Sequence, residues 1–382
     1  MGYSSDDNML YEETTLGKRF RIETSKSNAL AQTAGGWHCM VPANGYPNIG
    51  TFPGTDLLWQ SCWETTGDGT SIIGIQHNGN PGGTATKHLK FVNTMIVAAA
   101  GAPWHMKLVD LQGYYRISGA NVTGTGSRTL INSNTFTASS SSGLLLTYTN
   151  DFNTLTVVQF TTTTTLPTGL SLNTDYYLVR VSATTARVAT SLSNAIAGTV
   201  IAFTDAGTGT HTMSIRPRNA VGTEAFFCVQ TAPTAGGPNL TASSYTNSAG
   251  TAGRSFQGSP TFGAAADAYA TRIPHSGTGA GRYGSFLPKQ GGDVGIRSVE
   301  SFTLSGGTAY TGSGVMALCL GRTLVDFPVG QSGGAQEREL RNQIMSLPKV
   351  DDGACLVWLQ FCTGATTINS PMNSTLEFGW AG

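Results

Sequence analysis

The sequence contains few charged residues. Asp, Glu, Lys and Arg make up 12% of the 382 residues, and 22 basic side chains balance 22 acidic ones. Soluble domains usually carry about 25% charged residues. A nucleic-acid-binding surface needs clustered Lys and Arg, and disordered chains combine high net charge with low hydrophobicity. The composition therefore argues against both classes and predicts a chain with a large buried core and no nucleic-acid partner.

Patterns of export and membrane insertion are also missing. The N-terminal residues 1–8 are polar and acidic, without the basic and then apolar order of a secretory signal. The most apolar stretches, 94–102 and 354–361, are far shorter than the ~20 residues that cross a bilayer. We expect no membrane contact and synthesis in a reducing cytosol without secretion.

The six cysteines form no C-x-x-C pair, so neither a zinc knuckle nor a thioredoxin-like pair is predicted. Cys228 and Cys319 lie inside apolar runs. Buried free cysteines behave as small hydrophobic residues. We therefore predict buried free thiols rather than disulfides.

A break in composition divides the chain. Residues 119–215 contain no Lys, Glu, Cys or Trp, and 24 of these 97 residues are Thr. Threonine favours strands because its β-branched side chain packs well on a pleated surface. Short strands are expected at 155–160, 176–181 and 199–203, bounded by turn residues. We interpret 119–215 as a small inserted β-sandwich that projects from a discontinuous parent domain formed by 1–118 and 216–382.

The parent domain also has the pattern of an all-β fold. Continuous apolar runs are typical of strands buried on both faces, which predicts a β-sandwich or jelly-roll-like arrangement. A long Gly-rich loop is expected over 231–263. One short helix near the C-terminus is predicted over 335–345, capped by Ser332 and stopped by Pro348. The expected parent strands are 72–77, 106–111, 225–230, 314–320 and 355–362.

Catalytic motifs are weak. Ser332 lies in a G-x-S-x-G sequence, but no histidine follows it, since the last one is His275. His77 and His88 flank a Gly/Asn/Pro loop, and hydrogen-bonded loop histidines explain them better than a metal site. The glycines of 277–281 precede no helix, so a phosphate site is not predicted. We name no catalytic, cofactor-binding or metal-binding residue and predict that the chain is not an enzyme.

A glycosidase remains an open alternative, because several acidic residues lie near tryptophans in the sequence. Glycosidases use two carboxylates, and tryptophans can stack on sugar rings. Tryptophans beside apolar residues are more often part of a core. The residues concerned are Asp56, Glu64, Asp68 and Asp110, with Trp59, Trp63 and Trp104.

Two sets of motifs resemble bacteriophage virion proteins. The inserted segment, with its stretches 166–170, 174–179 and 201–212, resembles a small β-module that recurs in tailed-phage virion proteins, although it departs from the module at 187–189. The parent resembles a family of phage structural proteins often found with the major capsid protein. The matching parent stretches are 74–79, 86–88, 108–115, 244–254, 292–299 and 347–348.

The resemblance implies a capsid decoration, or cement, protein on the outer surface of the phage head. Its expected partners are the major capsid protein and further copies of itself, as a trimer, and its expected location is the virion. The alternatives are a tail-associated or receptor-binding protein whose insert contacts host surface glycan, and a polysaccharide-degrading enzyme. The pattern leaves head and tail, copy number, symmetry and the capsid-contacting residues open.

Overall fold

The structure is a computed structural model. It describes residues 11–27, 35–46, 51–63, 74–75, 77, 89–99, 104–123, 125–139, 145–231, 239–258, 260, 273–274, 284–305, 314–329, 335–340, 348–351, 353–362 and 371–381.

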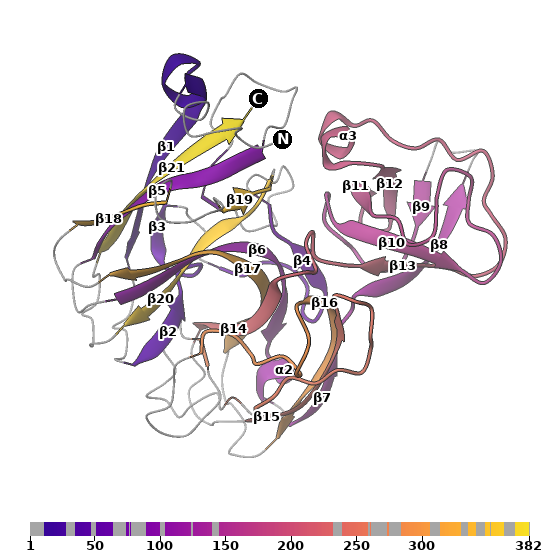
Figure 1. Ribbon diagram of the computed structural model, residues 1–382. Helices are drawn as coiled ribbons and strands as arrows, with labels where there is room; N and C mark the ends of the chain where they lie inside the picture. The colour runs from indigo at the N-terminus through magenta and orange to yellow at the C-terminus, as the bar shows by residue number, and fades with distance from the viewer. Residues whose placement is uncertain are drawn as a thin grey trace.

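The chain has an all-β fold, as the sequence predicts. Figure 1 shows a large body of sheets with a smaller β-barrel on one side. Helical structure in the described residues is limited to short segments, and no helix there has the length and apolar character that a membrane span requires. These segments are the π-helical turn η1 (Tyr11–Thr15), α2 (Ala120–Thr123) and α3 (Leu192–Ala197).

The first sheet of the large body has the antiparallel order β18-β5-β21-β1-β3, and β19 also pairs with β5. One face of β21 is apolar and buried, through Met372, Leu376 and Phe378. This face packs on the second sheet in one cluster. The strands are β1 (Arg19–Ser27), β3 (Asn44–Tyr46), β5 (Leu89–Ala99), β18 (Ala335–Glu339), β19 (Lys349–Val350) and β21 (Pro371–Ala381).

The second sheet has the order β14-β17-β6-β20-β2, with β4 paired to β6. Apolar clusters cover both of its faces, which explains the continuous apolar runs in its central strands. The predicted strands 106–111, 225–230, 314–320 and 355–362 all belong to this sheet. Its strands are β2 (Gly36–Cys39), β4 (Trp59–Ser61), β6 (Trp104–Ser118), β14 (Thr223–Thr231), β17 (Val315–Val329) and β20 (Leu356–Cys362).

A third, three-stranded sheet has the order β15-β16-β7. It consists of β15 (Asn239–Asn247), β16 (Ile296–Ser305) and β7 (Gly126–Thr129). Strand β7 comes from the segment interpreted as the insert, yet its partner β16 belongs to the parent part of the chain. The division into two independent domains stays a prediction, and the first strand of the predicted insert is part of the large body.

The rest of the inserted segment forms a closed barrel with the order β10-β11-β12-β9-β8-β13. The prediction of a sandwich is wrong here, because β13 pairs with both β8 and β10 and so closes the sheet on itself. Closure removes the free edges that a small sandwich would expose. The strands are β8 (Ser133–Ser139), β9 (Leu145–Thr147), β10 (Val157–Thr162), β11 (Tyr176–Ser182), β12 (Thr185–Ala189) and β13 (His211–Ile215).

The predicted helix over 335–345 is wrong in its described part. Residues 335–339 form strand β18, which pairs antiparallel with β5. Good helix formers occupy this segment, but sheet pairing and the burial of Leu340 against the core outweigh local preference. Ser332 and 341–345 lie outside the described residues.

Two loop and strand predictions also fail. The segment 199–203 is not a strand, and the expected loop over 231–263 contains the nine-residue strand β15. The cysteine prediction is confirmed, since all six cysteines are free and buried. Of the predicted strand 72–77, Ile75 makes an isolated bridge to Leu356.

Candidate functional site

Several of the residues considered from the sequence lie outside the described part of the chain. The structure therefore gives no account of the G-x-S-x-G serine or of part of the acid and histidine sets. These residues are Glu64, Asp68, His88, His275, 277–281 and Ser332.

The two described tryptophan side chains of the acid–tryptophan set are core residues. Trp59 and Trp63 are each 1% exposed. Trp59 packs edge-on against Tyr115, with ring centroids 5.2 Å apart. Neither ring presents a face to solvent, so the interpretation as core residues is confirmed and sugar stacking on these rings is not supported.

Asp56 is occupied by structural contacts. Its carboxylate pairs with Arg116 and accepts hydrogen bonds from the Ser118 amide at 3.0 Å and the Ser118 hydroxyl at 2.6 Å. These contacts anchor the end of strand β6 just before the chain leaves for α2. Asp56 therefore holds two segments together.

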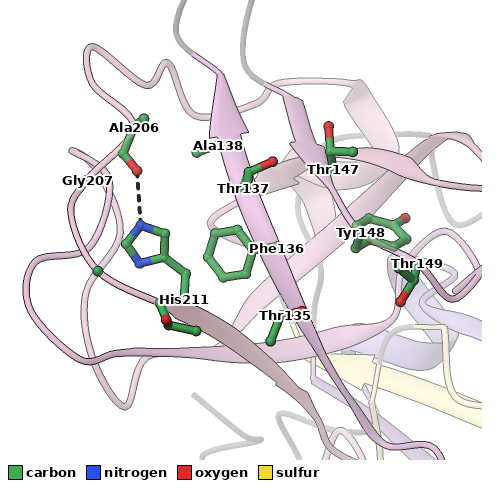
Figure 2. Close-up of a pocket in the computed structure, with 12 residues that line it drawn as sticks. Thr135, Phe136, Thr137, Ala138, Thr147, Tyr148, Thr149, Ala206, Gly207 and His211 are labelled. Carbon is green, nitrogen blue, oxygen red and sulfur yellow. Dashed lines mark hydrogen bonds between the residues drawn. The ribbon is translucent and has the colours of Figure 1, made fainter.

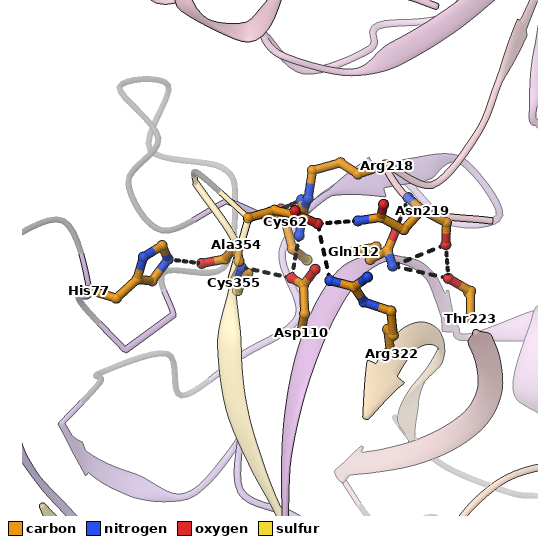
Figure 3. Close-up of polar contacts among 11 residues, drawn as sticks. Cys62, His77, Asp110, Gln112, Arg218, Asn219, Thr223, Arg322, Ala354 and Cys355 are labelled. Atoms are coloured by element: carbon orange, nitrogen blue, oxygen red, sulfur yellow. Dashed lines mark hydrogen bonds and ion pairs between the residues drawn. The ribbon is translucent and has the colours of Figure 1, made fainter. Parts of the chain in front are cut away.

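Asp110 is the centre of a buried polar cluster on strand β6 (Figure 3). Its Oδ1 atom accepts a hydrogen bond from the Cys355 amide at 3.0 Å and pairs with the Arg218 guanidinium. Arg218 also donates to the carbonyl of Cys62. The side chains of Asp110 and Arg218 are 0% and 7% exposed, so this ion pair is almost completely removed from water.

The same cluster extends along the link that follows the barrel. The Asn219 amide donates to Gln112 Oε1 at 2.7 Å, and Gln112 Nε2 donates to Thr223 Oγ1 at 3.0 Å. The Asn219 side chain donates to Asp351, which also pairs with Arg322 at 3.1 Å. The first residues after the barrel thus satisfy polar groups in the centre of the large body.

The charged groups of this cluster shift one another's pKa values. Burial raises the pKa of Asp110, and the nearby Arg218 and Arg322 oppose that rise. Burial also acts to raise the pKa of Asp351, but Arg322, Asn219 and Lys349 outweigh it and lower that pKa. Asp110 Oδ2 accepts no hydrogen bond from the described residues, consistent with the cost of holding its charge in the core.

A second polar cluster joins two of the stretches that carry the family resemblance. Asp293 accepts hydrogen bonds from the Tyr245 hydroxyl at 2.5 Å and from the side-chain amide of Asn247, Nδ2, at 2.7 Å. Arg254 donates to both of its oxygens, at 3.0 and 3.1 Å. The Arg254, Tyr245 and Asn247 hydrogen bonds lower the pKa of Asp293 to about 2. These motif residues therefore fasten the 245–254 hairpin to the 284–295 segment.

The barrel carries an open groove of about 600 Å³ (Figure 2). Threonines of β8 and the β9 region form one side, and the loop 206–210 forms the other. His211 lies between them, stacked on Phe136 with ring centroids 5.3 Å apart. The lining residues are Thr135, Phe136, Thr137, Ala138, Thr147, Tyr148, Thr149, Ala206, Gly207, Gly209, Thr210 and His211.

The residues around Asp205, which resemble the phage β-module, have structural roles beside this groove. Asp205 accepts hydrogen bonds from the amides of Gly207 at 2.8 Å and Thr168 at 3.2 Å. Gly207 has a φ of +69°, and a Cβ there would lie 2.5 Å from the Thr165 carbonyl oxygen. The His211 ring bonds to Thr162 and to the Ala206 carbonyl. The motif therefore joins the 205–211 segment to the 162–168 segment.

Histidines and acids in the described residues are used mainly in such structural contacts. His77, considered from the sequence, is buried and bonds to the carbonyl of Ala354 at 2.8 Å. No group of three or more His, Cys, Asp or Glu side chains among the described residues is arranged to hold a metal ion. Sequence reasoning did not single out Arg218, because its partner Asp110 is 108 residues away along the chain.

Comparison with known proteins adds no assignment. The chain matches no protein-family model, and a search of curated proteins finds no match. The resemblance to phage structural proteins therefore stays a prediction from the motifs themselves.

Proposed function

We propose that the chain is a structural protein of a tailed-bacteriophage virion, a decoration protein that binds the outer surface of the head as a homo-oligomer and stabilises the shell. The observation that supports this proposal is that carboxylate side chains, which could serve in catalysis, instead form ion pairs within the protein. Asp110 and Asp293, which lie in motif stretches, and Asp56, which does not, tie distant segments of the chain together. In such a protein the side chains serve the fold and its contacts, and repetition over a shell turns modest contacts into avidity.

The proposed partner is the major capsid protein, and the formal net charge of zero sets the character of the contact. Salt strongly weakens contacts between surface charges, whereas contacts of neutral sheet surfaces are much less sensitive. The proposed binding should therefore persist as salt rises. A lysine-rich cement protein would instead detach.

The test is co-sedimentation of the purified full chain with phage heads that lack it, over a series of salt concentrations. The proposal expects saturable binding that changes little with salt. Absence of binding to heads, together with binding to tails, would contradict it. A steep loss of head binding near physiological salt would contradict the neutral-surface explanation and leave the location intact.

The groove on the barrel favours a second candidate function, a receptor-binding virion protein that recognises host surface glycan. Exposed threonine hydroxyls at Thr135, Thr137, Thr147 and Thr149 offer donors and acceptors beside the groove. A glycan array probed with the full chain tests this candidate. Selective binding that is lost in Thr137→Tyr, and retained in Thr199→Tyr on the barrel surface outside the groove lining, would favour it over decoration.

A further inference from the structure

The indole of Trp63 lies at the junction between the barrel and the large body. On the barrel side it shares an apolar cluster with Leu155, Val157, Ala189 and Ala195. On the other side it contacts Gly353, where a Cβ would lie 2.7 Å from the indole ring at a φ of +68°. The absence of a side chain at Gly353 therefore leaves just enough room for this ring, and the Trp63 indole fills the space between the barrel and the large body.

Arg218 contacts the Trp63 indole and also binds residues of the large body. Its guanidinium carbon lies 4.4 Å from the centroid of the Trp63 ring, within the range of a cation–π contact. The same guanidinium pairs with Asp110 on β6 and donates to the carbonyl of Cys62. Arg218 follows the last barrel strand, β13, by three residues, so one side chain connects the exit of the barrel to the core of the large body.

Further contacts surround the same junction. Ser61 donates to Thr156 of the barrel at 3.0 Å, between buried side chains. Arg297 of β16 donates to Gln159 of β10 at 2.5 Å. The two chain crossings also lie side by side, since the Ile215 amide donates to the carbonyl of Asn132 at 2.7 Å. These contacts lie around the Arg218–Trp63 pair at the same junction.

We propose that Arg218 and Trp63 form a locked joint that holds the barrel at one orientation relative to the large body. The barrel is then a rigid arm and not a knob on a flexible tether. Relative motion is the usual expectation for two units joined by a modest interface, so this rigidity is a specific property of the joint. The proposal concerns the isolated chain and does not depend on where the protein acts in a virion.

The experiment measures the distance distribution between two spin labels, one on each unit. Thr184→Cys on the barrel and Ser25→Cys on strand β1 provide exposed attachment sites. The six native cysteines are buried, so the unsubstituted chain should take up no label, and that control is measured first. The wild-type background should give a single narrow distribution.

Two joint variants then test the lock. Arg218→Lys keeps a positive charge near Asp110 but loses the planar group that lies on Trp63 and donates in two directions. Asp110→Asn combined with Arg218→Gln removes both buried charges, so that neither is left unpaired. Each should broaden the distribution about twofold as relative motion returns, while the far-ultraviolet circular dichroism of the sheets stays unchanged.

The matched control is Arg187→Lys, a change of the same kind at an exposed position on β12. It should leave the distribution at its wild-type width. A broad distribution in the wild-type background would overturn the proposal. An equally narrow distribution in either folded joint variant would overturn it as well, because the joint would then not depend on Arg218.

Discussion

The most deeply buried ion pairs of the described residues lie in the large body, whereas the ion pairs of the barrel are more exposed. In the barrel, Arg180 and Asp151 form an ion pair whose side chains are 35% and 39% exposed. In the large body, Arg218 and Asp110 form one whose side chains are 7% and 0% exposed. The large body thus uses charges as internal struts, whereas the barrel relies on its apolar core and on hydroxyl and loop contacts. A protein with few charged residues can therefore still bury some of them, as it does with Asp110 and Arg218.

The largest effect is expected for Arg218→Ala in the large body. This change leaves the Asp110 carboxylate buried without its cationic partner, which costs about 3–5 kcal/mol of folding free energy. Urea denaturation at pH 7 measures the change. A loss smaller than 1 kcal/mol would show that Asp110 is protonated or solvated in the folded protein and is not an internal strut.

A smaller effect is expected for His211→Ala in the barrel. The His211 ring is buried, stacks on Phe136 and bonds to Thr162 and Ala206. Losing these contacts should cost about 2–3 kcal/mol. Hydrogen exchange of the barrel strands should accelerate while that of β6 and β17 does not. Equal acceleration in both regions would contradict a local role.

Lys26→Met should stabilise the large body, and the gain should depend on pH. Burial lowers the pKa of Lys26 to about 8 from 10.5. The folded state holds an unfavourable charge below pH 8, and that penalty is relieved as pH rises from about 8 to 10.5. The variant should therefore gain about 1–2 kcal/mol at pH 7, and the gain should shrink toward pH 10.

Urea denaturation of both proteins at pH 7 and pH 10 checks this difference. Lys26 also donates to the carbonyl of Ala43 at 3.1 Å, and that bond is lost in the variant at every pH. The pH dependence of the gain is therefore the decisive quantity. A gain that stays constant between the two pH values would contradict the buried-charge explanation.

The smallest effect is expected for Arg180→Ala on the barrel surface. Exposed ion pairs contribute about 0.2–1 kcal/mol, and salt screens them. The change in the free energy of unfolding should fall in that range at low salt and become smaller in high salt. A loss as large as that of Arg218→Ala would remove the distinction between the two regions.

Much of the fold could be predicted from the sequence, because local signals coincide with tertiary structure there. The apolar runs 106–111 and 355–362 are central strands buried on both faces, and burial produces that pattern. The Thr-rich composition correctly indicated strands in the inserted segment. The segment 335–339 shows the limit, since its helix-forming residues pair as an edge strand with β5. Pairing between distant segments decided that case.

The polar clusters could not be predicted in the same way. Asp110 and Arg218 are 108 residues apart, and only the folded sheet brings them together. Asp293 and Tyr245 are 48 residues apart, although both lie in stretches that resemble phage structural proteins. Motif similarity indicated that these stretches matter but not that they contact each other. Barrel closure also depends on long-range pairing, between β13 and β8.

The most direct test of the proposed function is the number of copies of this chain per virion, measured by quantitative mass spectrometry of purified particles against the major capsid protein. A decoration protein that covers the shell predicts a copy number of the same order as that of the capsid protein. A copy number matching that of tail-fibre or baseplate components would contradict head decoration, and absence from purified virions would contradict the structural role altogether.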